Sequence, residues 1–192
     1  MNLVIVSLIF VFAVPVLSQR NGQDLRAIPD LDLSRYSGRW FEVAKYPNRF
    51  QRRCVSDTTA TYTTKPNGRF EVVNRCRTGD GSILTAKGEA KTADKTSNSR
   101  LKVRFAPGFL SFLPFVWADY WVIGLGEDYQ YAVVGEPNRK YFWILSRTPD
   151  IDDAKLNEIL EQAEKMGFDP SRVERTRHSS ALSSDGAGPA QK

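Results

Sequence analysis

Between residues 40 and 147 the chain alternates short apolar segments with turn signals. The segments are rich in β-branched and aromatic residues, and Pro66-Asn67-Gly68 separates two of them as a strong turn. Residues 126–128 and 137–139 supply further linkers. The pattern predicts eight strands joined by short turns, in an antiparallel up-and-down barrel or a sandwich, over residues 40–46, 58–64, 70–77, 82–91, 100–105, 119–125, 129–134 and 141–147.

One segment, residues 151–166, follows the period of a helix instead. Its apolar residues recur mostly at three- and four-residue spacing, which predicts one amphipathic helix packed against the barrel wall. Thr148 or Asp150 is the candidate N-cap, and Gly167 ends the helix. A short ninth strand is expected at residues 173–176.

Both ends of the chain differ from this folded middle. Residues 3–17 form an apolar run broken only by Ser7 and Pro15, and small residues at 16 and 18 fit a cleavage site before Gln19. The run is short for a bilayer span, so residues 1–18 are predicted to be a cleaved signal peptide. No cysteine follows the cleavage site, so the expected location is secreted or periplasmic without a lipoprotein anchor. We expect a linker at 19–32, one domain at 33–178 and a disordered tail at 179–192, rich in Ser, Gly and Ala.

Composition narrows the function classes. The 192 residues include 41% hydrophobic side chains, an ordinary globular mix for one domain. The net charge is +5, but the chain has no block of five or more Lys and Arg residues. We therefore expect no nucleic-acid partner, while an anionic membrane surface stays open.

The reactive residues are few. Cys54 and Cys76 are the only cysteines, too few for a four-ligand zinc site, and an oxidising compartment favours their pairing. The single histidine, His178, lies in a polar segment and is interpreted as a solvated residue. No activated nucleophile or acid–base pair emerges, so the prediction is a non-enzyme with no metal and no cofactor.

Three motifs give the chain a family resemblance. They are Gly38-Arg39-Trp40 at the first strand, Ala118-Asp119-Tyr120-Trp121 where the family usually begins with Thr, and Arg147 at the end of the eighth strand before a helix. From about residue 33 to residue 177 the chain resembles the lipocalins, in the group that contains bacterial lipocalin and apolipoprotein D. The resemblance implies an eight-stranded barrel that carries a fatty acid, lysophospholipid or similar lipid, with a role in membrane maintenance or stress response.

The motif residues suit the closed end of such a barrel. Trp40 offers a large apolar plate, and the planar cation of Arg147 can stack on its face, a contact of about 0.5–2 kcal/mol. Gly38 lets the entering chain pass close to that stack. These three residues are therefore interpreted as structural, without ligand contact.

Alternation then predicts the ligand-contacting side chains. If Arg147 points inward, Leu145, Trp143 and Tyr141 do so as well. The Asn67-Gly68 turn places Tyr62 opposite Asn74, and the resemblance implies that these positions line the pocket. The predicted ligand contacts are apolar or aromatic groups with one orienting amide, and ordinary barrel core is the alternative: Tyr62, Asn74, Tyr141, Trp143 and Leu145.

The expected register creates a difficulty for the Cys54–Cys76 bond. It puts Cys76 near Ala60, six residues from Cys54 and far beyond bonding range at about 3.3 Å per residue. A bulge or folded-back segment at residues 55–57 is needed to close the gap.

The loops at the end opposite Trp40 should surround the mouth. Residues 47–53 and Arg139-Lys140 make a basic rim, and residues 107–115 make an unusually apolar loop. This loop is either a lid folded over the pocket or an element that docks transiently on an anionic membrane: Phe109, Leu110, Phe112, Leu113 and Phe115.

Two other functions stay open. A lipocalin-type isomerase or de-epoxidase needs an acid–base group, and Glu42 is the only acidic residue on the first strand. A carrier of a pigment or sterol needs no such chemistry, and haem is disfavoured because no pocket histidine is available. The expected oligomeric state is a monomer or weak dimer.

Overall fold

The computed structural model describes residues 24–94 and 96–180. The predicted signal peptide and residues 181–192 of the predicted tail lie outside this range. Within it, no helix is long and apolar enough to cross a membrane.

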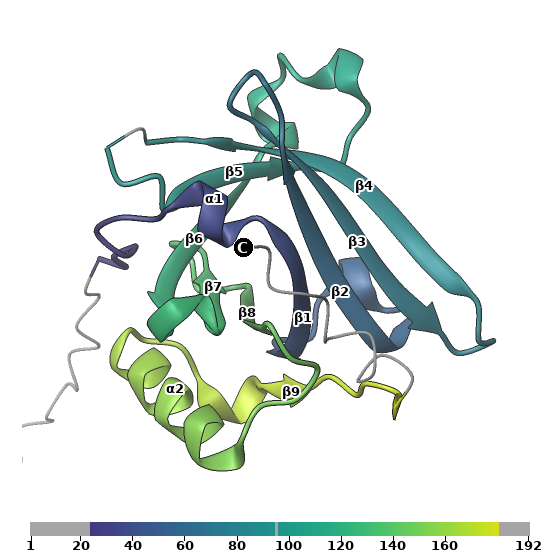
Figure 1. The fold of residues 1–192 in the computed structure, drawn as a ribbon, viewed down its shortest axis with the longest axis vertical. Coiled ribbons are helices and arrows are strands. Elements are labelled where there is room, and N and C mark those ends of the chain that lie inside the picture. The colour runs from purple at the N-terminus through teal and green to yellow at the C-terminus, as the bar shows by residue number, and fades with distance from the viewer. Residues whose placement is uncertain (1–23, 95, 181–192) are drawn as a thin grey trace, which may run out of the picture.

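Eight antiparallel strands form a closed barrel, which is one of the two arrangements that the alternation left open and the one that the family resemblance implied (Figure 1). Each strand pairs with the next along the chain, and β1 closes the ring because it pairs with both β8 and β2. Closure leaves no exposed edges among these strands. Their bounds are β1 Gly38–Lys45, β2 Cys54–Thr64, β3 Phe70–Thr78, β4 Ile83–Thr92, β5 Arg100–Arg104, β6 Ala118–Leu125, β7 Tyr131–Gly135 and β8 Phe142–Ser146.

Short helical turns connect several strands. A single turn of α-helix, α1 (Leu33–Tyr36), precedes β1, with Asp32 as its N-cap. Four 3-10 turns follow in the loops: η1 Arg49–Gln51, η2 Gly108–Leu110, η3 Pro114–Val116 and η4 Glu127–Tyr129.

Residues 24–32, predicted as part of a linker, belong to the folded domain. Leu25 and Leu31 are buried. The Ile28 N–H donates to the Val122 carbonyl at 2.9 Å, and the Leu31 N–H donates to the Ser97 carbonyl at 2.8 Å. The described part of the segment therefore packs against the barrel, because its apolar residues find partners that a linear pattern does not reveal.

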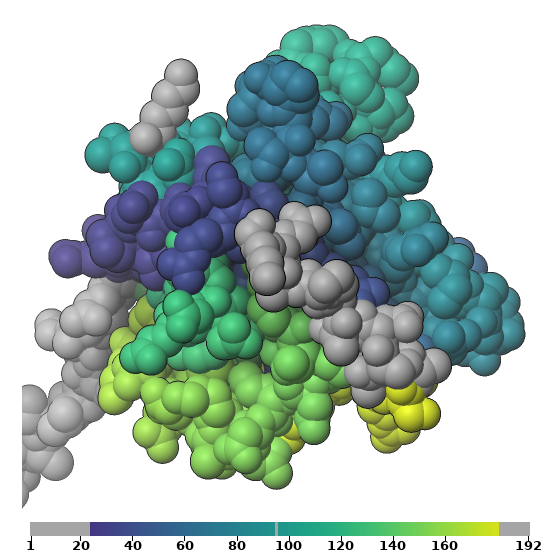
Figure 2. Space-filling view, viewed as in Figure 1, coloured from purple at the N-terminus to yellow at the C-terminus, as the bar shows by residue number. Residues whose placement is uncertain are grey.

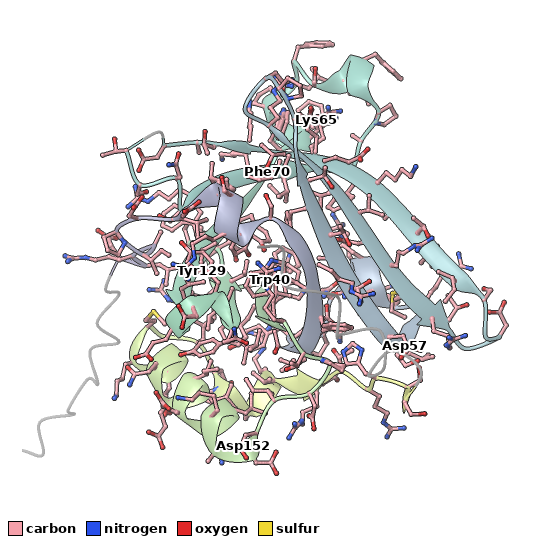
Figure 3. The ribbon with its side chains drawn as sticks, viewed as in Figure 1. Trp40, Asp57, Lys65, Phe70, Tyr129 and Asp152 are labelled. Carbon is pink, nitrogen blue, oxygen red and sulfur yellow. A yellow bond between two sulfur atoms is a disulfide. The ribbon has the colours of Figure 1, made fainter. Side chains whose placement is uncertain are left out.

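The predicted amphipathic helix is α2 (Asp153–Lys165). Its N-cap is Asp152, not Thr148 or Asp150, since the Asp152 carboxylate accepts from the Ala154 and Lys155 N–H groups. Gly167, at φ 86°, follows the last turn as expected. Figure 3 shows Asp152 at the start of the helix, on the outside of the barrel.

The molecule has two apolar clusters. One fills part of the barrel interior around Trp40, and the other lies between α2 and the outer face of strands β1, β6, β7 and β8. Leu156, Ile159 and Ala163 supply the buried face of α2. The helix therefore seals the outside of the wall and leaves the interior available.

The chain then returns to β1. After η5 (Pro170–Arg172) comes the expected short ninth strand, β9 (Glu174–Arg175), which pairs with β1. His178, interpreted from the sequence as a solvated residue, is half-buried: its Nε2 lies 2.8 Å from the Glu42 carbonyl oxygen, and its ring meets Phe41 edge-on. The Ser179 N–H donates to the Asp57 carboxylate at 2.6 Å, so the ordered chain continues past the predicted boundary at 178.

The β2–β3 hairpin differs from the expected register by two residues. The connection runs from Lys65 to Arg69, so Tyr62 faces Val72 and Ala60 faces Asn74. A shift of two residues preserves which side chains face the interior.

The Cys54–Cys76 disulfide is present, with 5.5 Å between the two Cα atoms. The ladder shifts register twice between Cys54 and Thr59, and Asp57 adopts a positive φ of 58° within this stretch. This irregular segment is the bulge that the pairing required, because it shortens the path between the two cysteines.

Candidate ligand-binding site

Trp40 and Arg147 close one end of the barrel. The Arg147 guanidinium lies 3.7 Å from the centre of the Trp40 ring and donates to three carbonyl oxygens, those of Arg35, Ser37 and Arg39. Gly38 has φ 95°, and a Cβ atom there would lie 3.5 Å from the Arg147 Nη1. Figure 3 shows Trp40 within the ring of strands. None of these three residues lines the cavity described below.

Three tyrosine hydroxyls form a chain inside this end. The Tyr120 hydroxyl lies 2.7 Å from that of Tyr36 and 2.8 Å from that of Tyr62. Burial raises the pKa of all three, that of Tyr62 to about 12, so each keeps its proton at neutral pH. The chain joins α1, β2 and β6, which are far apart in sequence, and sequence reasoning singled out only Tyr62 as a functional residue.

Beyond the tyrosines the interior is hollow. The cavity has a volume of about 630 Å³, within the range that holds small ligands. All five predicted contact residues lie on its wall, whose other members are mostly apolar: Tyr62, Asn74, Tyr141, Trp143 and Leu145. The inward alternation expected from Arg147 therefore holds along β8.

Asn74 is the amide of this wall. It lies on β3 between Ala60 of β2 and Ala86 of β4, so small side chains flank it on both sides. Its buried Oδ1 has no hydrogen-bond partner among the described residues. An unpaired buried amide oxygen is costly, and a ligand hydroxyl or N–H within reach would remove that cost.

A polar network borders the cavity beside β1. The Gln51 side chain donates to the Glu42 carboxylate at 2.5 Å and accepts from the Asn48 side chain at 2.6 Å and from the Trp143 indole N–H at 3.1 Å. The Thr176 hydroxyl donates to the other Glu42 oxygen at 2.7 Å. Burial is the main cause that raises the pKa of Glu42. The contributions of Asn48 and Gln51 were not predicted, because they depend on how η1 folds back over the barrel.

Aromatic rings lead from the surface into the cavity. Phe50, Tyr141 and Trp143 follow one another, with centroid separations of 5.5 and 5.8 Å. Arg49 and Lys140 lie over the rings of Phe50 and Tyr141. These cations border the entrance.

Arg139, expected on the same basic rim, lies elsewhere. Its Nε donates to the Met166 carbonyl at the end of α2, and its Nη1 donates to the Pro137 carbonyl. Arg139 therefore ties the β7–β8 loop to the helix.

The apolar loop between β5 and β6 projects at the top of Figure 1 and stands out from the body of the molecule in Figure 2. Phe109, Phe112 and Phe115 are 75%, 77% and 80% exposed, so they do not fold inward as a buried lid. Phe115 nevertheless borders the cavity. The loop therefore presents aromatic side chains outward beside the ligand site.

A buried group holds the base of this loop. The Trp117 indole N–H donates to the Ser111 carbonyl at 2.9 Å, and the cations of Lys91 and Arg104 lie over the Trp117 ring. Arg104 pairs in turn with Glu89 at 2.7 Å. These contacts fix where the loop leaves the barrel.

Among the described residues, no cluster of three or more His, Cys, Asp or Glu side chains could hold a metal ion.

An eight-stranded barrel with one plugged end and an interior cavity is the architecture of small-ligand carriers of the lipocalin type. A family model described as a lipocalin-like domain matches residues 31–178. The chain belongs to this family.

Individual proteins of similar sequence or structure support the assignment to the lipocalin-like family. Temperature-induced lipocalin-1 of Arabidopsis thaliana is 39% identical over 159 residues, which cover 82% of this chain and 84% of that protein. Outer membrane lipoprotein Blc of Escherichia coli K12 is 37% identical, covering 76% and 78%, and mouse apolipoprotein D is 30% identical, covering 77% of each. Insecticyanin of the tobacco hornworm Manduca sexta shares the fold, with a TM-score of 0.66 at 22% identity over 84% of this chain and 88% of that one.

Proposed function

We propose that this lipocalin binds and carries a small hydrophobic molecule, such as a fatty acid or lysophospholipid, and acts by binding and not by catalysis. The observation that carries the proposal is the cavity of about 630 Å³ with a largely apolar wall. An acyl chain placed there would gain about 25 cal/mol for each Å² of apolar surface removed from water. The membrane-maintenance or stress role implied by the family resemblance is part of the proposal.

The cavity's polar groups favour an amphiphile over a pure hydrocarbon. Asn74 and the Glu42–Gln51 pair offer hydrogen bonds inside the wall, and Arg49 and Lys140 border the entrance. An acyl chain would occupy the interior, and a negatively charged head group would remain beside the two cations. A pigment or sterol would use the same apolar wall without the entrance cations.

Extraction of the purified protein followed by mass spectrometry tests the carrier function. Ala86→Trp places an indole in the cavity, and Thr85→Trp places one on the outer face of the same strand as the matched control. We expect a lipid to co-purify with the wild type and with Thr85→Trp, and to be lost from Ala86→Trp. A wild-type protein that neither retains nor takes up any fatty acid or lysophospholipid contradicts the proposal.

We also propose that the β5–β6 loop docks on an anionic membrane surface, so that lipid passes directly into the barrel. The exposed Phe109 and Phe112 are suited to the apolar boundary of a bilayer. Each lysine or arginine near an anionic surface adds about 1 kcal/mol of attraction. Arg49, Arg52 and Lys140 are exposed and belong to the loops at the mouth.

Vesicle co-sedimentation tests this docking. The wild type should sediment with vesicles that contain phosphatidylserine more than with pure phosphatidylcholine. Phe109→Ser/Phe112→Ser should lose this binding, whereas Val55→Ser/Ile83→Ser, which removes other exposed apolar side chains, should keep it. Equal and negligible sedimentation of the wild type with both vesicles excludes docking.

Export through a secretory pathway completes the proposal. The apolar segment at residues 3–17 and the Cys54–Cys76 bond both fit an oxidising compartment. Amino-terminal sequencing of the mature protein should begin at Gln19; an intact Met1 in the exported protein contradicts cleavage.

A further inference from the structure

The three tyrosine hydroxyls at the inner end of the cavity carry one more proton than the hydrogen bonds among them require. Tyr36, Tyr120 and Tyr62 each carry one O–H, but only two hydrogen bonds connect the three oxygens. The described residues provide no other partner for these hydroxyls. One of the three O–H groups is therefore left without an acceptor among these oxygens, and a buried hydroxyl in that state is costly.

The two ends of the chain lie in different surroundings. Tyr36 is 1% exposed, packs 5.0 Å from Trp40 and does not line the cavity. Tyr120 and Tyr62 both line the cavity. A ligand can therefore reach the Tyr62 end, while the Tyr36 end is sealed.

The Arg147 cation orients the row of tyrosine O–H groups. Its guanidinium lies 3.7 Å from the centre of the Trp40 ring, which packs 5.0 Å from the Tyr36 ring, and from there it lowers the pKa of the Tyr36 hydroxyl against the larger effect of burial. A positive charge favours the lone pairs of the Tyr36 oxygen on its side, so the Tyr36 proton points toward Tyr120. Tyr120 then either accepts from Tyr62 as well or donates to it. Donation continues the hydrogen bonds in one direction, so that they polarise and strengthen one another, and it leaves the unused proton on Tyr62.

We propose that the Tyr62 hydroxyl is a donor subsite at the inner end of the cavity, which binds the oxygen of a neutral carbonyl or ester group carried by the inner, apolar part of the ligand, away from any head group at the entrance. This subsite rests on the proposed carrier function. It also extends the role of the Arg147–Trp40 stack, which orients the hydroxyl chain without contacting the ligand.

The charges around the cavity select a neutral oxygen over a carboxylate. The lining residues include two arginines, Arg49 in η1 and Arg75 on β3. Arg75 lies three residues from Val72, the partner of Tyr62, which is about 10 Å along the strand. A carboxylate at Tyr62 would lose its hydration without gaining a cation, whereas a ketone or ester loses little.

Competition binding tests the subsite with a matched ligand pair. Methyl undecyl ketone and tridecane have the same number of carbons and differ at one carbonyl. Each displaces a fluorescent fatty-acid probe from the wild type, from Tyr62→Phe and from Tyr46→Phe. The last variant is the control, because it removes a buried tyrosine hydroxyl that bonds to Asp169 outside the cavity.

We expect Tyr62→Phe to weaken ketone binding by about 2- to 10-fold, the value of one neutral hydrogen bond, and to leave tridecane binding unchanged or tighter. Tyr46→Phe should bind both compounds as the wild type does. A Tyr62→Phe variant that binds the ketone as tightly as the wild type overturns the subsite, even when both compounds displace the probe. A wild type that does not bind the probe at all removes the carrier function itself, whereas a bound probe that the ketone does not displace overturns the subsite alone.

The carbonyl stretching band of the bound ketone provides a second measurement, which is informative even if Tyr62→Phe folds poorly. In the wild type the band should lie below its position in a hydrocarbon solvent, as a hydrogen-bonded carbonyl requires. A wild-type band at the hydrocarbon position excludes a donor at the carbonyl and overturns the proposal.

Discussion

The Cys54–Cys76 bond should supply a measurable part of the stability of the barrel. It closes a loop of 22 residues that contains the entire β2–β3 turn. Chain-entropy reasoning assigns about 3.4 kcal/mol at 25 °C to a cross-link over that length. For a domain of this size, 1 kcal/mol corresponds to about 2–4 °C in melting temperature, so the expected loss is about 7–14 °C.

Two samples isolate this effect in thermal unfolding followed by circular dichroism. The reduced wild type keeps both sulfur atoms in place, and Cys54→Ala/Cys76→Ala lacks them. Both should unfold at similar, lowered temperatures, and reductant should not affect the double variant. A fully reduced wild type, verified by alkylation, whose melting temperature falls by less than about 2 °C would refute the reasoning.

Reduction of the disulfide should destabilise one region of the barrel more than the others. The bulge beside Cys54 holds Asp57, whose N–H donates to the Arg177 carbonyl and whose carboxylate accepts from the Ser179 N–H and from Arg77. Figure 3 shows Asp57 at this end of the β2–β3 pair. Amide hydrogen exchange should therefore quicken at residues 54–57 and 177–179 on reduction, more than in α2.

Three further predictions concern the plug, the buried carboxyl and the helix. Arg147→Met removes the stack on Trp40 and three hydrogen bonds, and we expect urea unfolding to show a loss of about 2–4 kcal/mol; a loss below about 0.5 kcal/mol would contradict the plug. Burial raises the pKa of Glu42, so the folded protein binds this proton more tightly than the unfolded chain does, and the contribution of Glu42 to stability falls as pH rises from its unfolded pKa through its folded pKa. Glu42→Gln should therefore gain stability relative to the wild type above that window and converge with it near about pH 4, and a constant difference across the urea midpoints at all pH values would be the contrary result. Leu156→Ala should lower the free energy of unfolding by about 2–5 kcal/mol in thermal unfolding, whereas Glu161→Ala, at an exposed position of α2, should be nearly neutral. Equal and negligible losses for the two variants would show that α2 does not stabilise the barrel wall.

The sequence by itself determined the eight strands, the main turns between them, the helix and the inward-facing side chains of β8. Alternation has a period of two and is a local property, so it carried the inward direction from Arg147 to Trp143. The hairpin put Tyr62 and Asn74 on one face, the family resemblance identified that face as the pocket side, and the two-residue shift of register left it unchanged. A shift of one residue would have reversed the face. The closed end of the barrel could also be predicted, because the family resemblance identifies Gly38, Trp40 and Arg147 as the residues that form it.

Only the tertiary structure decided the contacts between distant segments. Tyr36 and Tyr120 are 84 residues apart, and their hydroxyls meet because α1 and β6 converge inside the closed end. Gln51 reaches Glu42 and Trp143 because η1 folds back over the wall, and Leu25 and Leu31 are buried because the barrel offers them a surface. Such contacts depend on barrel closure and on the two register shifts before Thr59. No period along the chain encodes them, because each is set by the geometry of several strands at once.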